Sequence, residues 1–282
     1  IADPAPPKVQ YSDWLTAPLD RFVLGKLEDA GLAPAPDADP HSLIRRLYFT
    51  LIGIPPSPAE LEAFVRDPSD ANFTRIVDEL LASPHFGERW GRHWLDLARY
   101  SDSTGGGRSA LIPSAWRYRD YVIEAFNQDK PFDEFIRDQI AGDLLPFESD
   151  RQRTDQLTAT AFLALGPKNL DLKDKEQLRM NTVDEQIDTM GRTFLGMTLS
   201  CARCHDHKFD PVSARDYYAI AGILRSTRTL VLGNVSTLVQ NDLPVHEERR
   251  KAHAEFTKAK KALDAGIKAA KKAEEKERET KL

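Results

Sequence analysis

Two thiols and an imidazole lie together in the stretch Cys201–His205, which reads Cys-Ala-Arg-Cys-His and holds the only two cysteines of the 282-residue chain. Two cysteines three positions apart, followed at once by a histidine, form the pattern of covalent haem c attachment. Each thiol can add to one vinyl group of the porphyrin, and the adjacent imidazole then lies under the iron as proximal ligand. The spacing therefore predicts one covalent haem c on Cys201, Cys204 and His205.

Three other kinds of chemistry use cysteines at this spacing. A redox-active Cys-x-x-Cys is expected near a βαβ pattern, which the surrounding sequence lacks. A closed zinc site needs four ligands, and no second Cys-x-x-Cys or His-x-x-x-His completes a set with His205 or His207. A disulfide between Cys201 and Cys204 would close a very small loop and add little stability. Haem attachment is the favoured interpretation among these four.

The other side of the iron calls for a second axial ligand, and the best candidate lies in an earlier predicted helix. Helical spacing at i, i+3, i+4 and i+7 relates Trp90, His93, Trp94 and Leu97. The imidazole is therefore expected to point the same way as the two indoles. His93 is predicted as the second iron ligand, with a satisfied core histidine as the alternative. Arg99 is predicted to pair with a haem propionate or to join a structural ion-pair network.

Three further residues close to the motif could take part in haem binding. His207 lies too near His205 along the chain to reach the opposite side of the iron. It is predicted to give a supporting hydrogen bond or a propionate contact. Met190 and Met197 precede the motif, and either sulfur could in principle bind iron. The structural interpretation is that both methionines fill gaps in the core.

The elements that position these residues are predicted to be helices, because apolar residues recur at helical spacing and no series of alternating strands occurs. The fold class is mainly α: an irregular helical c-type cytochrome domain with long loops, followed by a helical spacer. Helices are predicted near residues 18–31, 40–53, 57–65, 70–81, 84–100, 115–126, 132–142, 184–195, 213–223 and 256–282. Polar residues 150–158 and the glycine-rich stretch 104–107 are predicted as loops.

Composition divides the chain into an acidic body and a basic tail. Residues 246–282 hold 12 Lys and Arg against 8 Asp and Glu, whereas residues 1–245 hold 27 against 36, a net charge of −9. An acidic body argues against nucleic acid as a partner, since nucleic-acid binding needs a clustered cationic face. We predict an extended segment over 1–14, a haem-binding domain over 15–235, and a charged helical spacer or start of a coiled coil over 236–282.

The haem motif also predicts where the protein is located. Covalent attachment of haem c takes place outside the cytoplasm, so a periplasmic or secreted location is predicted. The first residues lack a methionine, a basic region and an apolar stretch, so any signal peptide is expected to have been removed or left out. No run of about 18 apolar residues occurs, and no transmembrane segment is predicted.

Several stretches in a fixed order resemble one known family. They are residues 18–23, 43–48, 53–56, 82–100, 125–131, 141–145 and 201–218. Over about residues 15–228 the chain resembles the second planctomycete-type cytochrome c domain, long catalogued as a domain of unknown function. The resemblance implies a secreted or periplasmic haem c protein, usually within a larger polypeptide in which a helical spacer leads to a further domain. Met190 and Met197 depart from the family pattern, which leaves His93 ahead as axial ligand.

Three functions are compatible with these residues. The first is an electron-transfer module whose haem exchanges electrons with a partner protein or with a C-terminal domain of the same polypeptide, without catalytic residues of its own. The second is the redox half of a dehydrogenase that acts on an extracellular substrate such as a carbohydrate, with four polar candidates: Tyr100, Asp102, Arg119 and Asp210. The third is a scaffold in which haem only stabilises the fold. The sequence does not indicate an oligomeric state.

Overall fold

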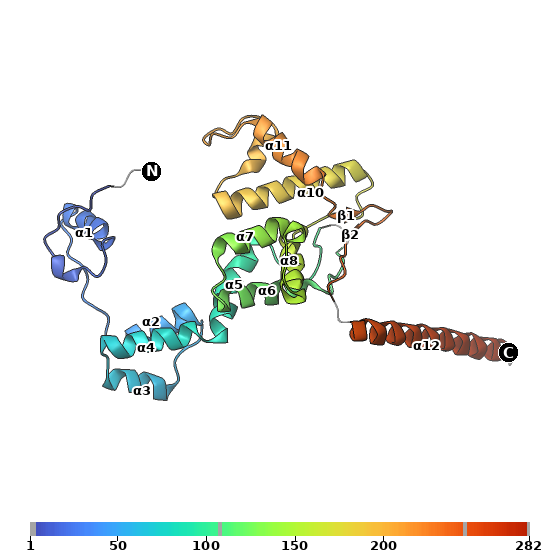
Figure 1. The fold of residues 1–282 in the computed structure, drawn as a ribbon, viewed down its shortest axis with the longest axis horizontal. Helices are drawn as coiled ribbons and strands as arrows, with labels where there is room; N and C mark the ends of the chain where they lie inside the picture. The colour runs from blue at the N-terminus through green and yellow to red at the C-terminus, as the bar shows by residue number, and fades with distance from the viewer. Residues whose placement is uncertain (1–3, 107–108, 245–246, 281–282) are drawn as a thin grey trace. The chain divides into compact units, whose positions relative to one another are not determined.

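The computed structural model describes residues 4–106, 109–244 and 247–280, and within them the chain is mainly α-helical, as predicted (Figure 1). The strands of this part are β1 (Leu230–Val231) and β2 (Thr237–Leu238), which pair antiparallel. Four pieces of the predicted segments lie outside the described residues: residues 1–3, Gly107 of the glycine-rich stretch, residues 245–246 and residues 281–282.

The chain divides into two compact units, residues 1–80 and 81–282, which are described one at a time. The helices of the first unit are η1 (Ser12–Trp14), α1 (Asp20–Asp29), α2 (Pro40–Leu51), α3 (Pro58–Arg66) and α4 (Asp70–Leu81). The predicted boundaries of the haem-binding domain at residues 15 and 235 stay predictions.

Capping residues begin two helices of the first unit where the sequence predicts them. Asp39 accepts a hydrogen bond from the Ser42 backbone N–H at 3.1 Å, and a proline opens α2. Ser57 and Glu60 form a reciprocal capping box at the start of α3, with distances of 2.7 and 3.3 Å. The core of this unit is apolar and consists of Ile44, Tyr48, Ile52, Phe64, Ile76 and Leu80.

The second unit carries the cysteine motif. Its helices are α5 (Pro84–Leu97), α6 (Ala115–Asn127), α7 (Phe132–Ala141), η2 (Gly142–Leu144), α8 (Asp150–Ala159), α9 (Ala161–Ala164), α10 (Lys175–Met190), the π-helical turn η3 (Gly191–Leu195), η4 (Leu199–Arg203), α11 (Ala214–Arg225) and α12 (Glu247–Thr280). Ser213 and Asp216 form a capping box at the start of α11, at the predicted place.

Two apolar clusters hold the second unit together. An aromatic core joins α5, α6, α7 and α9, and its largest members are Trp94, Tyr118, Tyr121, Phe135 and Phe162. A motif core joins α10, η4 and α11, which lie side by side, and contains Val183, Ile187, Leu199, Ala202, Tyr217, Ala221 and Leu224 (Figure 1). Met190 packs against both clusters, and Met197 packs against the motif core. The two methionines therefore occupy the gap-filling positions of the structural interpretation.

The close packing of α5 on α6 depends on glycines in α5. The Gly87 backbone N–H donates to Asn127 Oδ1 at 2.7 Å. A Cβ atom on Gly87 would lie 2.3 Å from the Ile123 carbonyl oxygen, whereas one on Gly91 would have no neighbour closer than 3.4 Å, which is ordinary van der Waals contact. Only hydrogen fits at Gly87, because the obstructing atom belongs to the backbone of a packed helix.

We expect Gly87→Ala to lower the free energy of unfolding by about 2 kcal/mol, because an overpacking cost of up to about 3 kcal/mol exceeds the helix-propensity gain of about 1 kcal/mol. Gly91→Ala makes the same chemical change on the same helix and is expected to be neutral or slightly stabilising. Urea unfolding followed by tryptophan fluorescence measures both variants. Equal midpoints for the two variants would contradict the packing argument.

One predicted loop is wrong. Residues 150–158 form most of α8, which begins at the N-cap Ser149, whose hydroxyl accepts from the Gln152 backbone N–H at 3.2 Å. The sequence shows no apolar stripe for this helix, because its buried side is partly polar. Gln156 is buried and donates to the Pro146 carbonyl at 2.9 Å. Arg153 also caps the preceding turn through the Gly142 carbonyl, at 3.3 Å.

The helix that precedes the motif is longer than predicted. It begins at Lys175, where Asp174 accepts from the Gln177 backbone N–H at 2.9 Å. Asp184, Glu185 and Asp188 therefore lie inside α10 and do not start it, which corrects the predicted range of 184–195. The helix ends in the π-helical turn η3 and at Gly196, whose φ is 64°.

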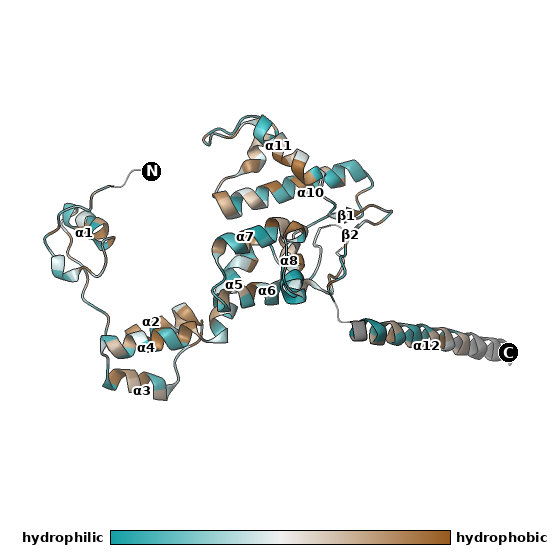
Figure 2. Ribbon diagram, viewed as in Figure 1, coloured by the Kyte–Doolittle hydropathy of each residue, from teal (hydrophilic) through white to brown (hydrophobic). Residues whose placement is uncertain are grey.

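The tail forms α12, which begins before the predicted start at residue 256. Hydrophilic and hydrophobic residues are mixed along the longer helices (Figure 2). Among the described residues, no helix combines the length and apolar character needed to cross a bilayer.

Candidate functional site

The cysteine motif lies on the short helical turn η4 and the residues directly after it. Leu199 and Ala202 are buried in the motif core, while Cys201, Cys204 and His205 are exposed. Both cysteines are free thiols. The turn thus inserts its apolar residues into the core and presents both sulfurs and the imidazole on one accessible stretch.

The imidazole of His205 has one nitrogen bound and one available. Its Nδ1 lies 2.8 Å from the backbone carbonyl oxygen of Asp206. Because a carbonyl only accepts, Nδ1 must carry the hydrogen, and Nε2 keeps its lone pair. A hydrogen bond of this kind also fixes the ring orientation and strengthens the other nitrogen as a metal donor. His205 is therefore prepared to bind a metal through Nε2.

His207 differs from His205 because both of its ring nitrogens are in use. Nδ1 accepts from the Asp210 backbone N–H at 2.8 Å, so Nε2 donates to Thr198 Oγ1 at 3.1 Å. The side chain is 7% exposed. His207 ties the loop after the motif to the residue that precedes η4, which is a positioning role.

Two carboxylates of α10 hold the motif in place. Asp184 accepts from Arg203, within the motif, at 3.0 Å and from the Tyr217 hydroxyl at 2.5 Å. One turn further along, Asp188 accepts from Ser200 at 2.8 Å. Burial and the bond to Asp184 raise the pKa of Tyr217. Sequence reasoning missed these supports, although two aspartates at i and i+4 just before the motif were a usable signal.

The prediction that His93 points the same way as both Trp90 and Trp94 on α5 is wrong. Trp94 is buried and its Nε1 donates to Tyr118 at 3.1 Å and to Gln139 at 2.9 Å, whereas His93 and Leu97 are exposed. The buried face of α5 includes Gly87 and Gly91, where α6 packs closely against it. Because this face is turned toward α6, His93 and Leu97 lie on the exposed side of the helix.

His93 stands on the surface beside Trp90, with the two ring centroids 5.5 Å apart. Trp90 is half-buried, and its Nε1 is buried without a hydrogen-bond partner. No hydrogen bond, ion pair or ring contact joins His93 to residues 201–205 in the described part of the chain. Neither His93 nor Trp94 has a hydrogen bond, ion pair or ring contact with His205 or His207 among the described residues.

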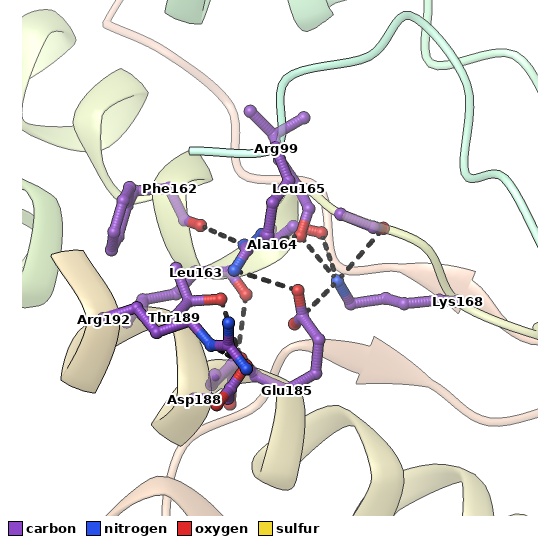
Figure 3. Close-up of polar contacts among 12 residues, drawn as sticks. Arg99, Phe162, Leu163, Ala164, Leu165, Lys168, Glu185, Asp188, Thr189 and Arg192 are labelled. Atoms are coloured by element: carbon purple, nitrogen blue, oxygen red, sulfur yellow. Dashed lines mark hydrogen bonds and ion pairs between the residues drawn. The ribbon is translucent and has the colours of Figure 1, made fainter. Parts of the chain in front are cut away.

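Arg99 is engaged inside the second unit (Figure 3). Its Nη2 donates to the carbonyls of Phe162 and Leu165, both at 3.1 Å, and its Nη1 lies 3.0 Å from a Glu185 carboxylate oxygen. The backbone of Arg99 has a φ of 53°, in the left-handed region, so this geometry is held by the surrounding contacts. The predicted alternative of a structural ion-pair network describes these contacts.

Lys168 completes a buried charged cluster with Arg99 and Glu185. Its Nζ donates to the carbonyls of Ala164 and Leu165 at 2.8 Å and lies 3.6 Å from Glu185. The side chain of Lys168 is 2% exposed, and burial lowers its pKa to about 8. Burial raises the pKa of Glu185 and lowers that of Arg99. The cluster holds two cations and one carboxylate.

The position of Glu185 in this cluster explains why residue 166 is a glycine. Gly166 has a φ of 95°, and a Cβ atom there would lie 2.4 Å from Glu185 Oε1. Only glycine allows the turn between α9 and Lys168 to pass this close to the carboxylate.

Three of the four residues considered for a dehydrogenase, Tyr100, Asp102 and Arg119, lie close enough to interact: after the bond to Asp120, the charges of Tyr100 and Asp102 raise the pKa of Arg119. Tyr100 donates to Asp102 at 2.8 Å, and burial, followed by that bond, raises the Tyr100 pKa to about 12. Arg119 bonds to its neighbour Asp120 at 2.8 Å. Asp210 lies instead beside His207, with 3.3 Å between Oδ2 and Nδ1.

Residues 18–229, which include the motif, match the family model PSCyt2, described as a protein of unknown function (DUF1549). The chain belongs to this family. Comparison with curated proteins and with solved structures found no match.

In this member of the PSCyt2 family, the exposed side of the motif offers donors and apolar surface together. The groups that could hold a cofactor are the thiols of Cys201 and Cys204 and the Nε2 lone pair of His205. Phe209 and Tyr218 are exposed, and the Tyr218 hydroxyl donates to the Arg203 carbonyl, within the motif, at 3.0 Å. Such a set fits a covalently attached macrocycle. Among the described residues, no group of three or more His, Cys, Asp or Glu side chains is arranged to hold a metal ion by itself.

Proposed function

We propose that this chain is a c-type cytochrome domain outside the cytoplasm, with one haem joined through thioether bonds to Cys201 and Cys204 and bound axially by His205. It would exchange electrons with a partner protein or with another domain of the same polypeptide. The observation that carries the proposal is the pair of exposed thiols beside an imidazole whose Nε2 lone pair is available.

The chain's own residues would position and tune this site. The Asp206 carbonyl orients His205, and Asp184 and Asp188 anchor the turn that carries the thiols. The bond to Asp206 restricts movement of the His205 imidazole and raises its basicity, while the bonds to Asp184 and Asp188 restrict movement of the turn. When bound, haem supplies one-electron chemistry at iron.

His93 remains our candidate for the second axial position. Its imidazole is exposed and forms no hydrogen bond in the described part of the chain, so both nitrogens are available. Met190 and Met197 are the weaker candidates, because both pack in the core.

Absorption spectra test the proposal on protein produced in the periplasm of a host with a c-type cytochrome maturation system. We expect a covalent haem with a low-spin ferric spectrum that is reversibly reduced. His93→Ala is expected to convert it to a high-spin form that binds CO, whereas His85→Ala, at an exposed histidine of the same helix, is expected to change nothing.

Each outcome decides one part of the proposal. A haem that cannot be reduced by physiological donors would overturn electron transfer and favour a stabilising role. A high-spin wild-type spectrum would overturn six-coordination. An unchanged spectrum in His93→Ala would exclude His93 as ligand and leave attachment at Cys201 and Cys204 intact.

A further inference from the structure

A pocket of about 500 Å³ lies in the second unit between α10, the end of α11 and the segment that runs from Ser226 into β1. Its size falls within the range of about 300–1,000 Å³ that is typical of small-molecule sites. None of residues 201–205 lines it. Its occupant would therefore be distinct from the haem of the proposed function.

The charge of this pocket is opposite to that of the body that surrounds it. Three arginines line it: Arg179, Arg225 and Arg228. Arg225 is neutralised by Glu176 at 2.8 Å, but Arg179 donates to an uncharged group, the Arg225 carbonyl, at 2.6 Å. The Arg228 side chain forms no ion pair or hydrogen bond within the described residues. Two guanidinium charges are thus left without a carboxylate partner.

Carbonyl groups at the end of α11 would repel an anion, but they are satisfied. The Ile223 carbonyl accepts from the Ser226 N–H at 3.0 Å, and the Leu224 carbonyl accepts from the Thr227 N–H at 3.1 Å. The Arg225 carbonyl accepts from Arg179. These carbonyls are therefore satisfied, and the guanidinium of Arg179 offsets the negative end of the helix dipole.

The rest of the lining combines apolar side chains with hydroxyl and amide groups. Val183 and Leu224 are buried and Leu230 is half-buried. Gln186 donates to Thr229 Oγ1 at 3.0 Å, which leaves the threonine hydroxyl with its own hydrogen to donate. The pocket thus combines two guanidinium groups without a carboxylate partner, one of them bound to a carbonyl, with a hydroxyl donor and an apolar wall.

We propose that this pocket binds a small organic dianion, a phosphate monoester or a dicarboxylate with a compact apolar part. Two guanidinium groups match two negative charges, because each fork can donate two parallel hydrogen bonds to anionic oxygens. The apolar wall favours a ligand with a hydrocarbon portion over an inorganic ion.

Isothermal titration of the full chain with phenyl phosphate and with phthalate tests this proposal, with inorganic phosphate and benzyl alcohol as probes that lack the apolar part or the charge. We expect at least one of the two organic dianions to bind more tightly than both control probes. Arg228→Gln and Arg179→Gln should each weaken that binding about tenfold, the effect of losing one charge-assisted contact. Arg215→Gln removes an equal charge from the exposed start of α11, outside the pocket, and should change affinity less than about twofold.

Several results would overturn the proposal. They are the absence of binding by both organic dianions, equal binding of inorganic phosphate, and equal weakening by Arg215→Gln, which would indicate unspecific attraction. Arg228 has no partner to lose, so its variant is expected to fold even where Arg179→Gln does not. None of these readouts involves haem, so this proposal and the cytochrome proposal can fail separately.

Discussion

Glu185→Gln is expected to lower the free energy of unfolding of the second unit by about 3–5 kcal/mol, the range for breaking a buried ion pair from one side. Glu185 lies 3.0 Å from Arg99 and 3.6 Å from Lys168, and it is the carboxylate between them. Its neutralisation leaves two cations close together in a poorly solvated site. Urea unfolding followed by circular dichroism at pH 7 measures the loss.

Lys168→Met is the matched control, and we expect it to cost clearly less. The variant keeps a neutral pair of Arg99 and Glu185, and its main cost is the unpaired Ala164 carbonyl, about 1–3 kcal/mol. The Leu165 carbonyl retains Arg99 as a donor. Equal losses in the two variants would show that the carbonyl contacts, and not the charge balance, stabilise this cluster.

The pH dependence of stability gives this cluster a second signature. The Lys168 pKa falls to about 8 from a reference value of 10.5, so between these values the unfolded chain binds more protons at this group than the folded chain. Stability contributed by this group therefore rises with pH across that window. The difference in stability between wild type and Lys168→Met should widen in favour of wild type from pH 8 to pH 10. A constant difference would contradict the lowered pKa.

Joint replacement of Cys201 and Cys204 by alanine is expected to abolish the haem that survives denaturation. Covalent attachment needs a thiol for each vinyl group, and the chain has no other cysteine. Both thiols are exposed, and the contact of Cys201 is a weak one of 3.7 Å to Thr198 Oγ1. The fold before attachment should therefore be unchanged.

Haem staining after denaturing electrophoresis, together with the mass of the intact protein, measures this loss. Each single cysteine variant is expected to retain at most one thioether bond. Lys208→Met changes an exposed residue close to the motif and should leave attachment complete. Haem that stays bound to the double variant after denaturation, or a wild-type protein that acquires none, would overturn covalent attachment at this motif.

Much of the helical architecture could be predicted from the sequence because its signals are local. Asp39, Ser57 and Ser213 each bond to a backbone N–H three residues away, so a short window of sequence contains both partners. Helix α8 escaped prediction because its buried side includes the polar residue Gln156, whose acceptor, the Pro146 carbonyl, lies outside the helix. The orientation of α5 could not be predicted because α6 packs at Gly87 and Gly91. Glycine has no side chain, so these positions do not contribute to a hydrophobic pattern in the sequence.

The candidate site divides in the same way. The sequence alone determined the two thiols and the imidazole, because their relation lies within five consecutive residues. Tertiary structure decided which residues support them: Asp184 meets Arg203, and Asp188 meets Ser200, only because α10 packs beside η4. It likewise joined Arg99 to Glu185 and left His93 on the surface. Spacing along one helix restricts which side chains can share a face, but the packing of neighbouring helices decides which face is buried.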